Sequence, residues 1–401
     1  MKWLRSFGPG ILVTAAFIGP GTVTTASRAG AQFGYALLWV VLFSVLAAIV
    51  LQEMSARLGL VTRQGLGEAL RSTFTHPVLR TASAALVIGA IAIGNGAYQM
   101  GNIAGASIGL EALTGMPREY GALATGLAAL LMLGLGGYLT IERLLIVLVA
   151  LMSVLFIVTA MVARPDASEV LSGLLSPRMP AKSTTTVIAL LGTTVVPYNL
   201  FLHASSVREK WGASVPLDRA LRESRLDTTV AVGIGGIITV AILVTAAAVF
   251  EPGSKIESLA DMAHQLKPLL GGAANACVAA GLTAAGLTSA VTAPLAAAYA
   301  TAGVLGWKDG LKSRRFRAVW AVIVIAGTLL AVLGRKPLEV IMFAQAANGI
   351  LLPVMAIFLI IVMNRTALLG EHRNRIASNV VGMAVVLIAA GLGVMKIVKL
   401  F

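Results

Sequence analysis

The chain has 401 residues, of which 58% are apolar and 12% are charged, whereas an average soluble domain has roughly 45–50% apolar and about 25% charged residues. This composition, with a mean hydropathy of +0.89, excludes a soluble enzyme, a disordered protein and a disulfide-stabilised scaffold. Apolar stretches of about 20 residues recur along the chain and predict an all-α polytopic membrane protein. The net charge of +14 is explained by Lys and Arg residues in cytoplasmic loops. Nucleic-acid binding is not predicted, because no basic stretch contains the interleaved aromatic residues that such binding would need.

The hydropathy pattern predicts about eleven transmembrane helices that form a single transporter domain over residues 1–401. The predicted helices are 9–32, 35–58, 82–113, 119–138, 142–163, 184–206, 227–250, 271–304, 317–334, 338–364 and 376–398. The first ten helices divide into two groups of five, at about 9–163 and 184–364, and 376–398 is an extra helix.

Basic residues orient the chain, because Lys and Arg concentrate in cytoplasmic loops. Two loops that both face inward if the N-terminus is cytoplasmic carry the richest clusters: Arg208, Lys210, Arg219, Arg222 and Arg225, and Lys308, Lys312, Arg314, Arg315 and Arg317. We therefore predict an integral protein of a prokaryotic cytoplasmic membrane, with its N-terminus in the cytoplasm and its C-terminus outside.

Acidic residues avoid the predicted spans. All 17 Asp and Glu residues fall in loops or near helix ends, apart from Glu53, which lies about two turns inside the second helix. Transporters of protons or metal ions commonly keep a carboxylate near the midplane as a countercharge. Because no carboxylate lies near the midplane, the sequence favours a cargo without net charge. We therefore expect the protein to bind no metal and no cofactor.

Two predicted helices are interrupted near their middles. The first contains Gly19-Pro20-Gly21-Thr22, and the sixth contains the segment 193–199, which includes Pro197. Proline removes a helical hydrogen bond and costs ~3 kcal/mol, and each glycine adds about 1 kcal/mol. A simple proline kink would explain either helix alone. Interruptions at corresponding positions of two halves instead predict inverted five-helix repeats, with unwound helices 1 and 6 around a substrate site.

Several segments together resemble the NRAMP (natural resistance-associated macrophage protein) family of divalent-metal transporters. These segments are Gly8-Pro9-Gly10, Ile18 to Thr22, Ala29 to Tyr35, Leu37 to Gly59, Pro197 to His203 and Ala344 to Gly349. The resemblance covers nearly the whole chain. It implies the same inverted-repeat bundle with unwound helices 1 and 6.

The sequence departs from that family at its metal ligands. The family's helix-1 motif is Asp-Pro-Gly-Asn, and its Asp and Asn fall on Gly19 and Thr22 here. The helix-6 motif Met-Pro-His falls on Val196, Pro197 and Tyr198, and the helix-3 acids of family members fall on Gln99 and Asn102. These replacements resemble a divergent NRAMP-related branch that is associated with citrulline and has lost the metal ligands.

The remaining groups suit a zwitterion. Backbone N–H groups near Gly21 could bind a carboxylate, and carbonyls near Gly19 could accept hydrogen bonds from an ammonium group. The candidate binding residues, which share a position at a break or on a facing polar helix, are Gly19, Gly21, Thr22, Thr193, Thr194, Tyr198, Gln345 and Asn348.

A further polar stripe on helix 3 has two interpretations. Asn95, Gln99 and Asn102 share one helical face, and they either line the site or make interhelical hydrogen bonds. Four hydroxyl residues of helix 8, Thr283, Thr288, Ser289 and Thr292, are typical of helix packing.

The sequence thus favours a secondary transporter that moves a polar organic solute by alternating access, with a neutral amino acid such as citrulline or a similar amide as its partner. The alternative is a divalent-cation transporter for Mg²⁺ or Mn²⁺ with an unusual, largely hydrated site. A third class is a non-transporting receptor built on a transporter scaffold. An enzyme is not expected, because no metal-ligand cluster, Ser/His/Asp set or paired carboxylates lie within the spans. The lipid bilayer is the other predicted partner, and the oligomeric state is open.

Overall fold

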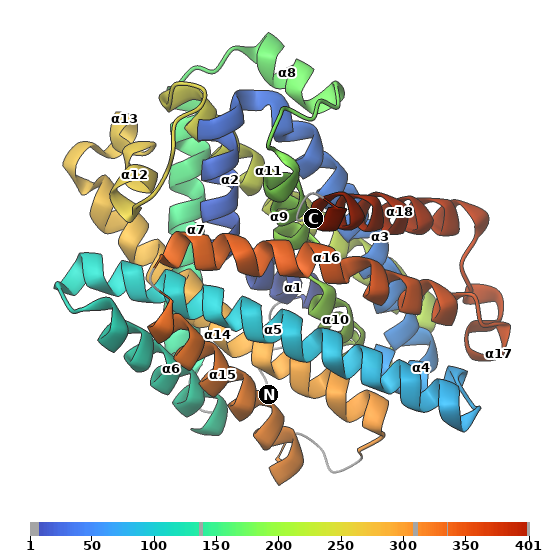
Figure 1. Ribbon diagram of the computed structural model, residues 1–401. Coiled ribbons are helices and arrows are strands. Elements are labelled where there is room, and N and C mark those ends of the chain that lie inside the picture. Colours follow the sequence, from blue (N-terminus) through green and yellow to red (C-terminus); the bar gives the residue numbers. More distant parts are fainter. Residues whose placement is uncertain (1–7, 136–138, 308–311, 335, 399–401) are drawn as a thin grey trace.

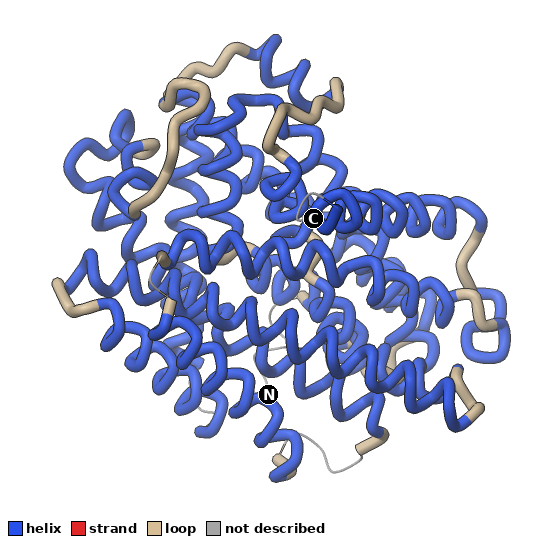
Figure 2. Tube along the Cα trace, viewed as in Figure 1, coloured by secondary structure: helices blue, strands red, loops and turns tan. Residues whose placement is uncertain are grey.

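The computed structural model describes residues 8–135, 139–307, 312–334 and 336–398, and every regular element within them is helical (Figure 2). Lys308 of one basic cluster and the end of the predicted helix at 119–138 fall outside these residues. The helices that correspond to the predicted spans are α1 (Pro9–Phe17) with α2 (Pro20–Phe33), α3 (Leu38–Thr62), α5 (Pro77–Thr114), α6 (Arg118–Leu135), α7 (Leu139–Val162), α9 (Thr184–Thr194) with α10 (Pro197–Lys210), α11 (Leu217–Val249), α14 (Ala274–Leu305), α15 (Arg314–Leu333), α16 (Pro337–Met363) and α18 (Ile376–Val398).

Among the described residues, nine helical stretches are long enough and apolar enough to cross a membrane. One of them, Pro20–Thr62, joins two predicted helices, because only the short 3-10 helix η2 (Gly34–Leu37) separates α2 from α3. The shorter α6 is not among the nine. The all-helical membrane fold is therefore as predicted, and each predicted span coincides with one helix or with a pair of half-helices.

The two broken helices occupy the centre of the bundle. Within its most apolar window the α9–α10 stretch is 94% buried, whereas α7 is 28% buried. Figure 1 shows α1 and α10 in the middle of the molecule, behind α5, α14 and α16, which run side by side across the view. The outer helices direct large apolar side chains away from the core, for example Leu144, Val147 and Leu151 on α7. This is the arrangement a lipid-facing layer requires.

Two predicted helices are longer than expected. Helix α11 begins at Leu217 instead of residue 227, after Pro216, and α5 begins at Pro77 instead of residue 82. Hydropathy marks the part of a helix that lies in lipid, whereas these helices continue into the polar region beyond it. As a result Asp227 lies inside α11, where its Oδ2 accepts a hydrogen bond of 2.7 Å from the Gly10 N–H at the start of α1.

Four of the predicted polar connections contain short helices. The short helices are α4 (Leu66–Thr73), α8 (Ala167–Leu175), α12 (Leu259–His264), α13 (Lys267–Leu270) with the 3-10 helix η3 (Gly271–Ala273), and α17 (Thr366–Leu369) with η4 (Gly370–His372). Of these, α12 and α13 belong to the same connection. Several of them begin with local capping, as at Asp166, whose side chain accepts hydrogen bonds from the N–H groups of Ser168 and Glu169. Caps of this kind define helices that are too short for a hydropathy pattern to reveal.

A buried arginine joins α3 to the segment that follows α17. The Arg57 guanidinium donates to the carbonyls of His372 and Arg373 at 2.7 and 3.2 Å, and to Asn374 Oδ1 at 2.8 Å. It also pairs with Glu53 at 3.1 Å, and its side chain is 7% exposed. A charge removed from water in this way is stabilising only while its partners remain.

We expect Arg57→Met to lower the free energy of unfolding by about 3 kcal/mol, because it leaves buried acceptors without a donor. Arg219→Met is the matched control: Arg219 is 68% exposed and pairs at 2.7 Å with Glu223, so its loss should leave the unfolding midpoint almost unchanged. Thermal unfolding in detergent compares the two variants. Equal midpoints for both would contradict the structural role of Arg57.

Candidate transport site at the two helix breaks

Helix 1 is interrupted at Ile18 and Gly19, between α1 and α2. The Gly19 N–H turns back to the Phe17 carbonyl at 3.0 Å, and Pro20 has no N–H group. The carbonyls of Ala15 and Ala16 therefore lose the donors that a continuous helix would supply. Backbone oxygens thus become available in the middle of the bundle.

Helix 6 is interrupted in the same manner at Val195 and Val196, between α9 and α10. The Val195 N–H closes the last turn of α9 on Leu191 at 2.9 Å, and Pro197 opens α10 at the first helical position. Proline is tolerated there because the first N–H groups of a helix have no intrahelical partner. The predicted pair of breaks is therefore present in the structure.

A pair of hydroxyl groups joins the two breaks. Thr22 Oγ1 lies 2.8 Å from Thr193 Oγ1, across 171 positions of sequence, and it also hydrogen-bonds the Phe17 carbonyl. Thr194 is arranged differently, since its hydroxyl donates to the Leu190 carbonyl of its own helix at 3.0 Å. Of the two threonines next to the helix-6 break, Thr193 therefore faces the break of helix 1.

Helix α16 supplies the amides of the site. A Cβ atom added at Gly21 would lie only 2.2 Å from Gln345 Nε2, so the Gln345 amide rests directly on the helix-1 break. Gln345 and Asn348 are each 1% exposed. Within the described residues, neither Gln345 Oε1 nor Asn348 Nδ2 has a hydrogen-bond partner.

Two tyrosines pack together beside the breaks. The ring centroids of Tyr98 and Tyr198 are 5.3 Å apart with an interplanar angle of 69°, an edge-to-face contact. Tyr98 Oη donates to the Ala16 carbonyl at 3.0 Å, which replaces one of the donors lost at the break. Tyr198 Oη is buried and has no partner among the described residues.

The helix-3 stripe makes interhelical hydrogen bonds and also leaves free polar atoms. Asn95 Nδ2 and Gln99 Nε2 donate to the α14 carbonyls of Ala293 and Ala290, at 3.2 and 3.0 Å. Gln99 Oε1 and Asn102 Nδ2 have no partner in the described part of the chain. The packing interpretation therefore accounts for Asn95 and for one end of Gln99, but not for Asn102.

One residue at the breaks was not among the predicted binding residues. Ser289 on α14 is fully buried, and its Oγ lies 3.0 Å from the position that a Cβ of Gly19 would take. Sequence patterns placed this serine among packing residues, since nothing in the helix-8 sequence shows which hydroxyl faces another helix.

The site is uncharged. Among the described residues, no group of three or more His, Cys, Asp or Glu residues could hold a metal ion. The imidazole of His203, within helix 6, hydrogen-bonds through Nδ1 to Gln52 Oε1 at 2.9 Å, and its Nε2 has no partner among the described residues. The groups at the breaks are hydroxyls, amides and carbonyls, which can contact a cation or the water around it but cannot neutralise its charge.

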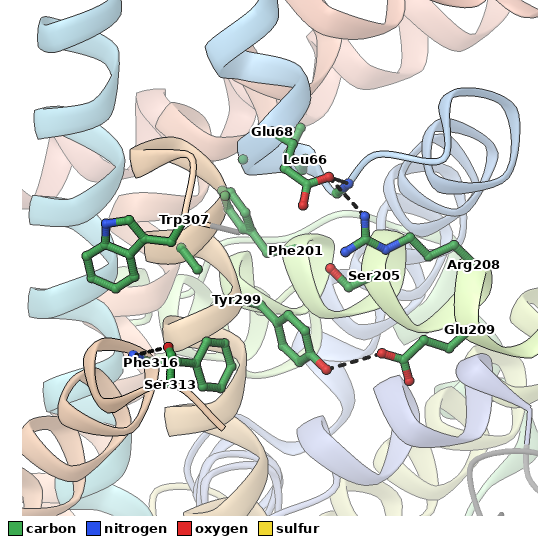
Figure 3. Close-up of a pocket in the computed structure, with 14 residues that line it drawn as sticks. Leu66, Glu68, Phe201, Ser205, Arg208, Glu209, Tyr299, Trp307, Ser313 and Phe316 are labelled. Carbon is green, nitrogen blue, oxygen red and sulfur yellow. Dashed lines mark hydrogen bonds and ion pairs between the residues drawn. The ribbon is translucent and has the colours of Figure 1, made fainter. Parts of the chain in front are cut away.

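A separate pocket of about 400 Å³ lies farther along α10, between α4, α14 and the start of α15 (Figure 3). Arg208 donates to Glu68 Oε2 at 2.9 Å on one side of it, and Tyr299 Oη donates to Glu209 at 3.4 Å on another. Phe201 lines the same pocket, one turn beyond the start of α10. The pocket therefore extends from near the break toward the end of the bundle that carries the basic clusters.

Two broken helices that enclose a polar site inside an all-helical membrane bundle define the class of inverted-repeat membrane transporters. A family model, "Natural resistance-associated macrophage protein-like", matches residues 10–399. The chain belongs to this family and is an integral membrane transporter.

Sequence relatives carry metal-transport names. A divalent metal cation transporter MntH of Bradyrhizobium diazoefficiens is 34% identical over 90% of this chain and 81% of its own length, and that of Deinococcus radiodurans is 29% identical over 96% and 88%. A natural resistance-associated macrophage protein 2 homolog of Dictyostelium discoideum is 30% identical over 100% of this chain, and the chain spans 64% of that protein's length.

Solved structures share the fold. A manganese transporter of Eremococcus coleocola superposes with a TM-score of 0.81 at 22% identity, covering 98% of this chain and 86% of that protein. MhsT in complex with L-phenylalanine superposes with a TM-score of 0.61 at 16% identity, covering 98% of both chains. The fold is thus the inverted-repeat bundle with unwound helices 1 and 6.

The expectation of an organic cargo was wrong. The relatives are named divalent metal cation transporters, and solved structures with the same fold include manganese transporters, so the citrulline, amino-acid and amide interpretations are withdrawn. The expectation rested on the argument that a site without carboxylates does not take a cation. That argument applies to a bare dication, and it is weaker for a dication that keeps its water.

Proposed function

We propose that the chain is a secondary transporter of a divalent metal cation, Mg²⁺ or Mn²⁺, which it binds in a partly hydrated state at the two helix breaks. The observation that carries the proposal is the hydroxyl contact of 2.8 Å between Thr22 and Thr193, set among buried polar atoms that have no hydrogen-bond partner within the described part of the chain. Buried polar groups are almost always hydrogen-bonded, so their accumulation at one place indicates a ligand or its water.

A cation that keeps part of its water shell can occupy a site that has no carboxylate countercharge. Burying an uncompensated dication in a medium of low dielectric constant costs tens of kcal/mol by Born estimates. Mg²⁺ dehydrates reluctantly and usually keeps several water molecules in protein sites. Hydroxyl and amide groups can hydrogen-bond those waters, and the backbone carbonyl of Ala15, which loses its helical donor at the break, adds a further acceptor. The proposed site residues are those at the breaks: Gly19, Gly21, Thr22, Thr193, Thr194, Tyr198, Gln345 and Asn348, with Asn95, Gln99 and Asn102 as further polar lining.

We propose that the cation leaves toward the basic end of the bundle, through the pocket lined by Phe201 and Glu209. Because α10 begins at Pro197, Phe201 stands roughly 6 Å along the helix from the break. Under this proposal that end is cytoplasmic, the N-terminus lies inside and the C-terminus outside. The two inverted five-helix repeats would span residues 9–163 and 184–364 approximately.

Uptake by purified protein in liposomes tests the function. We expect Mn²⁺ and Mg²⁺ to enter the liposomes through the wild-type protein and not through protein-free vesicles. Mn²⁺ should be preferred over Cd²⁺, because the ligands that the site offers are oxygen atoms and include no sulfur. Absence of both Mn²⁺ and Mg²⁺ uptake, together with binding of neither ion, would overturn the proposal.

The hydroxyl contact makes its own prediction. Thr193→Val keeps the shape of the side chain but removes its oxygen, and we expect cation affinity to fall about fivefold, which corresponds to about 1 kcal/mol, one hydrogen bond. Thr194→Val is the matched control, since Thr194 donates to its own helix at Leu190. Titration calorimetry of both variants measures the difference. An unchanged affinity in Thr193→Val would show that the two hydroxyls do not contact the cation or its water.

A further inference from the structure

Ser289 has an unusual hydroxyl for a residue inside a helix. Serine and threonine hydroxyls in helices commonly donate to a carbonyl one turn earlier. Thr288 does so, to Ala284 and Ala285 at 3.0 Å each, and Thr292 donates to Thr288 at 3.3 Å. The Ser289 hydroxyl is 0% exposed and has no partner among the described residues.

This hydroxyl lies next to the position where helix 1 lacks a side chain. Gly19 is extended, with φ of −132° and ψ of −173°, and connects the two half-helices. A Cβ atom on Gly19 would lie 3.0 Å from Ser289 Oγ and 3.8 Å from Ser289 Cβ. Helix α14 therefore presents an oxygen beside the place where a side chain of residue 19 would begin.

We propose that Ser289 is a ligand of the transported cation, either directly or through one water molecule, and that it stands in for the side chain that residue 19 lacks. This inference rests on the proposed function. A hydroxyl oxygen suits a hard cation, and burial without a protein partner costs free energy unless a ligand or water satisfies the group. The site is then built from four elements: both helix breaks, α16 and α14.

Exchanging the oxygen for sulfur tests the contact. In a Cys277→Ser background, Ser289→Cys places the sole thiol of the chain at this position, and thiolate ligands select soft metals. We expect Cd²⁺ to bind at least about tenfold more tightly than it binds to the background protein, and Mg²⁺ to bind more weakly. A residue that only packs α14 would not change the order of metal preference.

Thr288→Cys in the same background is the matched control, because the neighbouring hydroxyl donates to its own helix. An equal gain in Cd²⁺ affinity for both variants, or no gain in Ser289→Cys, would overturn the ligand role. Uptake of Mn²⁺ or Mg²⁺ by the background protein is measured alongside. Uptake that persists while Ser289→Cys shows no Cd²⁺ gain refutes this inference alone, whereas its absence in the background protein and the wild type refutes the proposed function as well.

Discussion

Gly21→Ala is expected to reduce divalent-cation uptake at least about tenfold while the protein remains folded. The added Cβ would stand 2.2 Å from Gln345 Nε2 and 2.4 Å from its Cδ. Both atoms belong to the far end of a flexible side chain, so the Gln345 amide can move aside at little cost to stability. Its departure removes an amide from the helix-1 break, and a tenfold loss corresponds to about 1.4 kcal/mol of binding free energy.

A double-mutant cycle separates this mechanism from general damage. Gln345→Ala alone should reduce uptake to a similar extent, and adding Gly21→Ala to it should cause little further loss, because both changes act on the same amide. Uptake into liposomes and thermal unfolding of the four proteins provide the comparison. Independent, multiplicative losses would show that Gly21 acts by some route other than Gln345.

Gly192→Ala is expected to impair folding itself, with a loss of about 3 kcal/mol or more in the free energy of unfolding. A Cβ on Gly192 would lie 2.0 Å from the Gln345 carbonyl oxygen and 2.4 Å from the Gly349 nitrogen. Both are backbone atoms of α16, so relief requires α9 and α16 to separate. The close approach of these helices is what holds the helix-6 break against Gln345.

Gly96→Ala is the matched control for this substitution. Gly96 is also a buried helical glycine, but a Cβ there meets nothing within 4 Å. Alanine is favoured over glycine inside a helix by up to about 1 kcal/mol, so this variant should be as stable as the wild type or more so. Thermal unfolding and size-exclusion profiles in detergent compare the two. A stable, monodisperse Gly192→Ala protein would contradict the tight α9–α16 contact.

Much of this architecture could be predicted from the sequence, because bilayer thickness imposes a strong pattern. Runs of about 20 apolar residues identify the spans, and Pro20 and Pro197 identify the two breaks. The extension of α11 before residue 227 and the short helices between spans could not be predicted in this way, since amphipathic turns and local caps leave no hydropathy signal.

The two helix breaks were predictable from the sequence, but the side chains around them were predictable only in part. The proline-centred breaks indicated Thr22 and Thr193, whose hydroxyls meet at 2.8 Å. The close approach of Ser289 to Gly19 could not be recognised, because it depends on which face of α14 meets the break. The absence of carboxylates was visible in the sequence, and it led to the organic cargo that the metal-transporting relatives contradict.

Crystals soaked in Mn²⁺ and measured for anomalous scattering test most directly whether a divalent cation binds at the paired breaks. The proposed carboxylate-free site predicts an anomalous peak between the Thr22 and Thr193 hydroxyls and the Gln345 amide, with Ser289 within direct or water-mediated reach. A protein that takes up Mn²⁺ but shows no peak there, or shows one only beside Glu68 and Glu209 in the separate pocket, would contradict it.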